Sequence, residues 1–398
     1  MRRINLKKAQ TARLATVRDI NRQIVLNYVR EREPISRATI AKETALQRST
    51  VSAIVDSLQN EGLVEEIGAG ESTGGRRPTL LRLRAAEAIA IGVSITPVQI
   101  TVATCDLAGR ILSQREFPIH PDADRTLKTV IDCINQFKTA NAAAIESVGI
   151  SLPGLIDPSA GVAFYVPYFQ WRDLPVAQII SAATSLPVTV DNDANAIALA
   201  ELWFGRPEVA DARDFILILV AEGVGTGIII DGQVYRGQCG AAGEFGHMIV
   251  GSNAPVACSC GNYDCWEAFS SERAALARYR QLAGNGSDQR SVDFPTFIDR
   301  ALAGESQANE VLAETARYLG IGISNLVVGF SPEVVVVGGR IARAWSLIGA
   351  PLSETFERSV RRGLPSARIL ASTLDQEPTL MGALSLVLAS KFAAKFAA

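Results

Sequence analysis

Four potential metal ligands lie close together in the second half of the chain. His247, Cys258, Cys260 and Cys265 follow the spacing H-x10-C-x-C-x4-C. One imidazole and three thiolates suit a tetrahedral zinc ion and leave no open position for a catalytic water, so the site is expected to be structural. The same ligands disfavour magnesium and calcium. The alternative is a group of buried free thiols beside a core histidine. The C-x-C spacing favours a metal site over this alternative.

Positive charge is concentrated near the N-terminus. Residues 1–90 hold 16 Lys/Arg and 10 Asp/Glu, whereas residues 91–398 hold 23 and 31. A basic head on an acidic body indicates that only the head meets a polyanion such as DNA. Charge alone is also compatible with a small domain that happens to be basic.

The head is predicted to be a winged helix-turn-helix domain. Apolar residues within 18–31 fall on one helical stripe that Pro34 ends, and Ser36 is a candidate N-cap for a second helix over 37–44. A third helix, 48–60, starts with side chains of the types that read base edges in the major groove. These candidate DNA contacts are Gln47, Arg48, Ser49, Thr50 and Ser52.

A hairpin follows the third helix. Strands are predicted over 63–67 and 79–83, on either side of a glycine-rich loop that ends with Arg76 and Arg77. Paired arginines on such a wing suit contacts with the DNA backbone. The alternative is a three-helix unit with a hairpin that has a purely structural role and does not bind DNA. A single domain of this kind makes few base contacts, so a dimer on a two-fold operator is expected.

The remaining residues predict an α/β body with an internal structural repeat. Strands over 88–95, 98–105 and 111–117 are followed by a helix and a buried strand, 147–152, that ends in Pro153-Gly154. The strand 215–220 starts the same order of elements again. Two similar lobes around a cleft are therefore expected.

These segments resemble the ROK family (repressors, open reading frames and kinases), and specifically its repressor branch. The head matches through LQRSTVSAIVDSLQNEGLV and STGGRRP. The body matches through GISLPGLID, DNDANAIALAE, GVGTGIIIDG, GEFGHMIV, CSCGNYDCWEAF and VVVVGGRI. The resemblance implies a two-lobed actin/hexokinase-like (ribonuclease H-like) α/β body behind the winged helix-turn-helix domain. The expected domains are 1–86, 87–196 and 197–398, with the last helix free to return to the first lobe.

The resemblance also implies a sugar site between the lobes. Its residues would be Gly154, Asn192, Asp193, Glu244, His247 and Glu267. The set is chemically sensible, because carboxylates and a carboxamide at strand ends satisfy hydroxyl groups. His247 would then bind zinc through one ring nitrogen and a hydroxyl through the other. For Asp193 the alternative is a helix N-cap, and for the two glutamates it is a solvated surface charge. The aromatic segment 165–168 departs from relatives that carry an asparagine there, so the expected ligands include a bulkier sugar, a modified sugar or a disaccharide.

The phosphate-binding turns of a sugar kinase are only half present. Asp193 stands where the kinases of the family carry the general base, and the second turn, 225–227, survives. The first turn of those kinases reads Asp-x-Gly-Gly-Thr, whereas this chain has Ser94 and then Pro97, which has no N–H. Losing that carboxylate should remove most transition-state stabilisation. We expect no catalytic residues, and Asp193 becomes a sugar-hydroxyl acceptor.

The function expected from the sequence is a sugar-responsive repressor, with operator DNA and a sugar effector as partners. A residual sugar kinase and a regulator whose effector is another protein are the alternatives. We expect a cytoplasmic protein, because no signal core or membrane-length apolar run is present. We also expect a homo-oligomer, a dimer or tetramer, that does not associate with the membrane.

Overall fold

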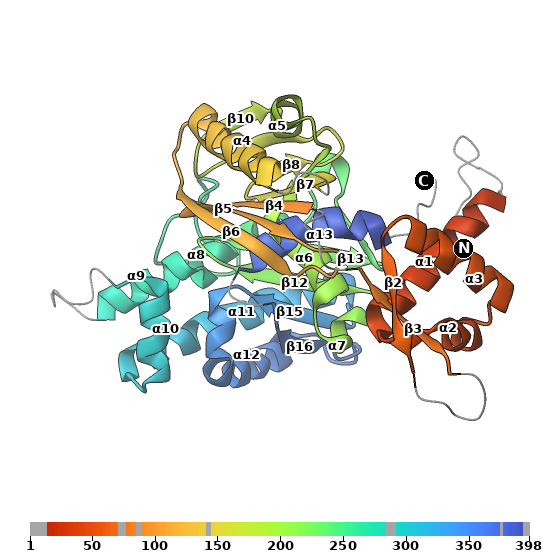
Figure 1. The fold of residues 1–398 in the computed structure, drawn as a ribbon. Helices are drawn as coiled ribbons and strands as arrows, with labels where there is room; N and C mark the ends of the chain where they lie inside the picture. Colours follow the sequence, from red (N-terminus) through yellow and green to blue (C-terminus); the bar gives the residue numbers. More distant parts are fainter. Residues whose placement is uncertain are drawn as a thin grey trace.

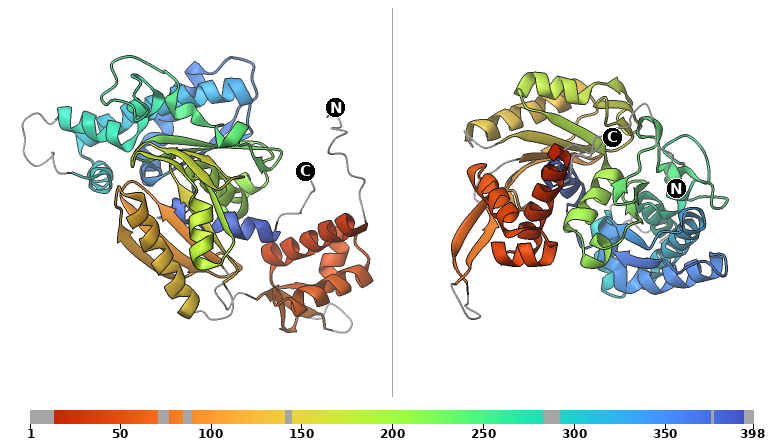
Figure 2. Two further views of the ribbon diagram at one scale, coloured as in Figure 1. Left: turned by 90° about the horizontal axis from the view of Figure 1, so that it is seen from above. Right: turned by 90° about the vertical axis from the view of Figure 1, so that its right-hand side faces the viewer.

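The structure is a computed structural model that describes residues 14–70, 77–84, 90–140, 145–282, 292–374 and 377–392. These residues form a small helical head beside a two-lobed α/β body (Figures 1 and 2). No helix within these ranges is long and apolar enough to cross a membrane.

The head contains α1 (Leu14–Arg32), α2 (Arg37–Thr44) and α3 (Arg48–Asn60). Its three-stranded sheet has the order β1-β3-β2, formed by β1 (Ile35–Ser36), β2 (Val64–Ala69) and β3 (Thr79–Leu83). The predicted second and third helices and the returning strand are confirmed. Ser36 caps α2, since its hydroxyl accepts from the N–H of Thr39 at 3.1 Å. Strand β1 was not predicted, because two residues carry no periodicity.

The body contains two five-stranded sheets with the same topology. The first has the order β11-β7-β4-β5-β6, with β4 (Ala90–Ile95), β5 (Gln99–Cys105), β6 (Ile111–Pro118), β7 (Ser147–Leu152) and β11 (Val188–Asn192). The second has the order β14-β13-β12-β15-β16, with β12 (Phe215–Val220), β13 (Val224–Ile230), β14 (Gln233–Val234), β15 (Val334–Gly338) and β16 (Arg368–Ala371). In each sheet the first strand pairs antiparallel with the second and parallel with a later one. The predicted duplication is therefore confirmed.

Helices cover both sheets. In the first half of the body they are α4 (Ala123–Ala140), α5 (Val176–Thr184), α6 (Asp193–Phe204) and α7 (Pro207–Ala210). The second half has α8 (Trp266–Ser270), α9 (Glu272–Leu282), α10 (Phe294–Leu302), α11 (Ser306–Phe330), α12 (Trp345–Ser359) and α13 (Pro378–Phe392). A small sheet of β8 (Leu155–Asp157), β9 (Val162–Val166) and β10 (Trp171–Leu174) extends the first lobe. That sheet was not predicted.

The C-terminal helix α13 joins the first lobe to the head. It packs against β4, β7 and α6, and it also contacts α1. Leu26 and Val29 of α1 share one buried apolar cluster with Leu384, Leu388 and Phe392 of α13. The cluster is continuous across the two parts, and α13 points from the body into the head (Figure 2). The head is thus packed onto the body as well as tethered to it.

Candidate functional site

All six residues predicted to bind sugar line one cleft. The cleft has a volume of about 1190 Å³ and is bounded by strand ends and loops of both lobes. Its walls include Gly154, Asn192, Asp193, Glu244, His247 and Glu267. The structure therefore brings together residues as far apart in the chain as Gly154 and Glu267.

Asn192 fixes the floor of the cleft. Its Nδ2 donates to the carbonyl oxygen of Gly154 at 3.1 Å, and its Oδ1 accepts from the N–H of Ala194 at 2.9 Å. Asn192, and not Asp193, is therefore the N-cap of α6. Gly154 has φ +100°, and a Cβ there would lie 2.3 Å from the carbonyl oxygen of Tyr165. Only glycine allows this close approach.

Asp193 is the first residue of α6 and faces the cleft. Burial raises the pKa of its carboxyl to about 6, and the nearby Glu244 carboxylate adds to the rise. The N–H of Ala194, 2.8 Å from Oδ1, partly opposes that shift. A carboxylate in this position is a strong acceptor for a ligand hydroxyl.

Glu267 is almost fully buried, with 3% of its surface exposed, so the alternative of a surface charge was wrong for this residue. Its Oε1 accepts from the N–H and the hydroxyl of Ser259, at 2.8 and 2.7 Å. Its Oε2 and the hydroxyl of Tyr168 converge beside Gly223, where a Cβ would lie 2.7 and 3.0 Å from them. Glu267 thereby links the cysteine loop, which contains Ser259, to the cleft.

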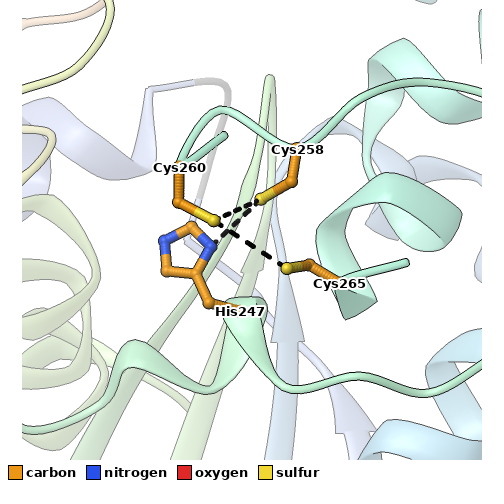
Figure 3. A group of neighbouring side chains, drawn as sticks. All are labelled: His247, Cys258, Cys260 and Cys265. Atoms are coloured by element: carbon orange, nitrogen blue, oxygen red, sulfur yellow. Dashed lines mark hydrogen bonds between the residues drawn. The ribbon is translucent and has the colours of Figure 1, made fainter. Parts of the chain in front are cut away.

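The four predicted metal ligands form one cluster (Figure 3). Their ligand atoms lie within 4.8 Å of one another, a group that could hold a metal ion. The Sγ of Cys258 lies 3.2 Å from Nδ1 of His247 and 3.2 Å from Sγ of Cys260, which is 3.9 Å from Sγ of Cys265. Zinc–sulfur bonds of about 2.3 Å give tetrahedral edges of roughly 3.8 Å, so this donor set fits zinc in both chemistry and size.

The two nitrogens of the His247 ring face different surroundings. Nδ1 faces the thiols, whereas Nε2 lies 3.4 Å from Oε2 of Glu244, whose side chain is half exposed. Because His247 and Glu244 both line the cleft, one ring edge is directed at the cluster and the other at Glu244 in the cleft wall. The shared role of His247 in metal and sugar binding stays a prediction.

The segment 94–99, where the family's kinases are expected to carry their first phosphate turn, satisfies its own polar groups. The hydroxyl of Thr96 accepts from the N–H groups of Val98 and Gln99, at 3.4 and 3.1 Å. The N–H of Thr96 itself donates to the carbonyl of Gln99 at 2.9 Å. Ser94 is buried, and its hydroxyl donates to Oγ1 of Thr379 at 2.8 Å. In the second turn, the hydroxyl of Thr226 donates to the carbonyl of Gly243.

The acidic cleft residues Glu222, Glu272 and Glu377 were not predicted, and Tyr168 was noted only as part of the aromatic segment 165–168. Glu272 is buried, and burial raises its pKa to about 7 although Arg340, at 3.3 Å, opposes the shift. The signal available in the sequence was weak. Glu272 and Glu377 stand at helix starts, where an acidic residue is ordinary.

The predicted DNA-contacting residues occupy the start of α3. Gln47, Arg48 and Ser49 are exposed, and Thr50 and Ser52 are partly buried. Gln47 makes no side-chain capping bond, so the first turn of α3 carries no side-chain cap. Arg77 is exposed, whereas Arg76 and most of the wing loop lie outside the described residues.

Arg37 was not predicted to have a role, but it connects three elements of the head. Its guanidinium contacts Asp56 and Gln59 of α3, at 2.6 and 2.8 Å, and Glu66 of β2 at 3.1 Å. These contacts fix α3 relative to α2 and the hairpin.

Arg30 of α1 anchors the head on the body. Its guanidinium carbon lies 4.7 Å from the ring centre of Trp203 and 4.9 Å from that of Phe392. The Nδ2 of Asn27 also donates to the carbonyl oxygen of Phe392 at 2.9 Å. Trp203 is in the last turn of α6 and Phe392 ends α13, so two body helices terminate at one head residue.

A winged-helix head, a duplicated α/β body and a cleft between the lobes define a protein built like a sugar kinase with a DNA-binding domain. Comparison with known proteins agrees. The family model described as "ROK family" matches residues 90–390, and the one described as "MarR family" matches residues 24–77. This chain belongs to the ROK family.

Its relatives include repressors. The chain is 33% identical to a xylose repressor of Caldicellulosiruptor bescii, over 94% of this chain and 96% of that protein. It is 29% identical to the DNA-binding transcriptional dual regulator NagC of Escherichia coli, over 96% and 95%.

The similar solved structures include a transcriptional regulator and a sugar kinase. A ROK family transcriptional regulator, described as a homologue of the E. coli MLC protein, covers 95% of this chain and 97% of its own, with a TM-score of 0.79 and 27% identity. A ROK family glucokinase from Streptomyces griseus, in complex with glucose and AMPPNP, covers 75% of this chain and 98% of its own, with a TM-score of 0.68 and 30% identity. The kinase match leaves out a quarter of the chain.

Proposed function

We propose that this protein is a sugar-responsive transcriptional repressor that binds operator DNA through its head and a sugar in the interlobe cleft. Relatives named as repressors match nearly the whole chain, including the head. For a bacterial repressor the site of action is the cytoplasm. The domain division 1–86, 87–196 and 197–398 remains part of this proposal.

The observation that carries the proposal is a pair of helices that join the cleft to the head. Helix α6 starts with Asp193 in the cleft wall and ends near Trp203, under Arg30. Helix α13 starts with Pro378 and Thr379 in the cleft wall and ends with Phe392, under the same arginine. At 1.5 Å per residue they span about 18 and 22 Å.

Such helices give the sugar a physical route to the DNA-binding domain. A ligand that closes the lobes changes the position of α6 and α13, and Arg30 transmits that change to α1. Sugar then alters DNA affinity only if the two conformations of the protein, which differ in the position of the head, bind sugar with different affinity. In a dimer on a two-fold operator, a small shift of each head changes the spacing of the two recognition helices. We therefore propose a homo-oligomer, a dimer or tetramer.

On DNA, the start of α3 would enter the major groove. Gln47, Arg48, Ser49, Thr50 and Ser52 would contact base edges and phosphates, and Arg76 and Arg77 would contact the backbone from the wing. The exposure of Arg48 and the absence of a side-chain cap at Gln47 support this docking, because both leave donors free for phosphate.

In the cleft, the sugar hydroxyls would be bound by Asn192, Asp193, Glu244, His247 and Glu267, with the Gly154 turn closing the floor. His247 and three cysteines, Cys258, Cys260 and Cys265, would hold a structural zinc ion. When bound, zinc fixes the cysteine loop and the orientation of the His247 ring. His247 then presents Nε2–H to a sugar hydroxyl, and Ser259 holds the Glu267 carboxylate in place.

We propose that the body has no kinase activity. Ser94 is bonded to Thr379 and offers no carboxylate, and Pro97 offers no N–H in the turn that would grip phosphate. Asp193, although placed like a general base, then has no phosphoryl group to direct a hydroxyl toward.

The test compares binding with turnover. The purified full chain is titrated calorimetrically with xylose, glucose and N-acetylglucosamine, and ADP release is followed for each sugar with ATP and magnesium. Binding of at least one sugar without ADP release above the protein-free rate supports the repressor. Sugar-dependent ADP release that Asp193→Asn abolishes supports the kinase alternative instead. If no sugar binds, the effector is of another class and the proposal is wrong.

A further inference from the structure

The carboxylates of the cleft stand at the starts of helices. Asp193 begins α6 and Glu272 begins α9, while Glu377 immediately precedes α13. Glu244 begins a short 3-10 helix, Glu244–His247, and Glu267 is the second residue of α8. All five line the same cleft. Helix starts carry partial positive charge and bind phosphate in many proteins, but here each one already has an anion of the chain's own.

At two of these helix starts, those of α6 and α9, backbone N–H groups are also occupied. In α6, the N–H of Ala194 donates to both Asn192 and Asp193, and that of Asn195 donates to Asn192 at 3.3 Å. In α9, the N–H of Glu272 donates to the carbonyl oxygen of Ala221 at 2.9 Å. The turn at Thr96 uses its own N–H groups, as described above. A phosphate entering the cleft would find few unpaired donors.

The arginines that line the cleft already have acidic partners. Among the described residues that line it, two are arginines and none is a lysine. Arg340 pairs with Glu272 at 3.3 Å, and Arg343 pairs with Asp299 at 2.7 Å. Arg273, next to the cleft, donates to the carbonyl oxygen of Glu222 at 2.9 Å and lies 3.5 Å from Glu267.

We infer that the cleft selects an uncharged sugar and rejects the phosphate ester of the same sugar. The inference rests on the proposed function and adds the chemical class of the effector. A phosphate dianion would meet six carboxylic side chains, two arginines that already have partners, and the starts of α6 and α9, whose first N–H groups are already bonded. A neutral sugar meets the same groups as hydroxyl acceptors. The effector is therefore the unphosphorylated sugar, which is the substrate of a phosphorylation reaction.

Tyr168 is a further specificity residue in this account. Its hydroxyl lies beside Glu267, and burial together with the Glu267 charge raises its pKa, so it remains a donor at neutral pH. Asp193 and Glu222 also act on it electrostatically. Tyr168 supplies a neutral donor among carboxylates, which a sugar hydroxyl can use as a partner without any charge on the ligand.

The test uses the full chain and matched ligand pairs in calorimetry at about 0.15 M salt. The pairs are glucose with glucose 6-phosphate, N-acetylglucosamine with its 6-phosphate, and xylose with its 5-phosphate. We expect the phosphate ester to bind at least about tenfold more weakly than the free sugar. The ratio should shrink as salt is raised, because partly exposed charges are screened.

Three variants locate the effect. Glu222→Gln removes one cleft charge and should narrow the ratio several-fold, whereas Glu357→Gln, on the exposed face of α12, should leave it unchanged. Tyr168→Phe should weaken the free sugar and its ester together. Equal or tighter binding of the ester overturns the inference and leaves the proposed function standing. Failure of every sugar and every ester to bind contradicts the proposed function itself.

Discussion

The guanidinium of Arg30 lies over the ring of Trp203, with 4.7 Å between its central carbon and the ring centre. The side chain of Arg30 is only 12% exposed, and Phe392 flanks it at 4.9 Å. A desolvated cation against aromatic rings contributes about 1–2 kcal/mol. That energy holds the DNA-binding head against two helices that begin in the cleft.

Replacing Arg30 should uncouple the two binding events. In Arg30→Ala we expect sugar affinity within about twofold of the wild type, while the change in DNA affinity on adding sugar falls toward none. Calorimetry for sugar and anisotropy for DNA measure the two quantities. Arg32→Ala, an exposed neighbour in α1, is the matched control and should retain the full response. A normal response in Arg30→Ala would show that coupling runs elsewhere.

The metal cluster should support sugar binding. Cys260→Ser is expected to lose bound zinc and to weaken sugar by about ten- to a hundredfold, since the metal orients His247 and, through Ser259, Glu267. Zinc content by atomic emission and sugar affinity by calorimetry are the readouts. Cys239→Ser is the control, because Cys239 is exposed and outside the cluster. Loss of zinc with unchanged sugar affinity in a folded protein would contradict this role.

The start of α3 and the wing should contribute differently to DNA binding. Arg48→Ala should cost about 1–3 kcal/mol on a selected operator and relax base preference, if Arg48 reads a base. Arg77→Ala should weaken all sequences similarly and reduce the slope of log affinity against log salt by about one. Anisotropy titrations at several salt concentrations measure both effects. Arg358→Ala, exposed on α12, should change neither.

Sugar affinity should depend on pH through Asp193. Burial raises the pKa of this carboxyl to about 6, so the acceptor form is complete above that pH and declines below it. Affinity should therefore fall as pH decreases from 7 to 5, approaching about tenfold per pH unit below the pKa. Asp193→Asn should bind more weakly at pH 7 and lose most of this dependence. A flat profile in the wild type would mean that Asp193 does not accept from the ligand in its ionised form.

The local elements of the head could be predicted from sequence, because each has a local cause. Ser36 followed by a helical run gave the start of α2, and the spacing of Val51, Val55 and Leu58 gave the buried face of α3. The metal cluster was also accessible, since its ligands are rare residue types that lie close in sequence.

Contacts between distant segments could not be read in this way. Nothing around Arg30 indicates that Trp203 and Phe392 will lie against it, because that contact depends on how α13 returns to the first lobe. Glu272 was missed for a related reason, since an acid at a helix start is ordinary until the fold turns that start toward a cleft. Asn192 took the N-cap position that was weighed for Asp193, and Asp193 lies in the cleft wall.

The most direct test of the account measures DNA binding with and without sugar. High-affinity duplexes are first selected from a random pool with the full chain, and the best is labelled for anisotropy titrations. Adding a sugar that calorimetry shows to bind should change the dissociation constant for this duplex by at least about fivefold, in the range of ordinary allosteric coupling, and Asp193→Asn should lose most of that change. An unchanged dissociation constant at saturating sugar would contradict the central claim that the cleft controls the head.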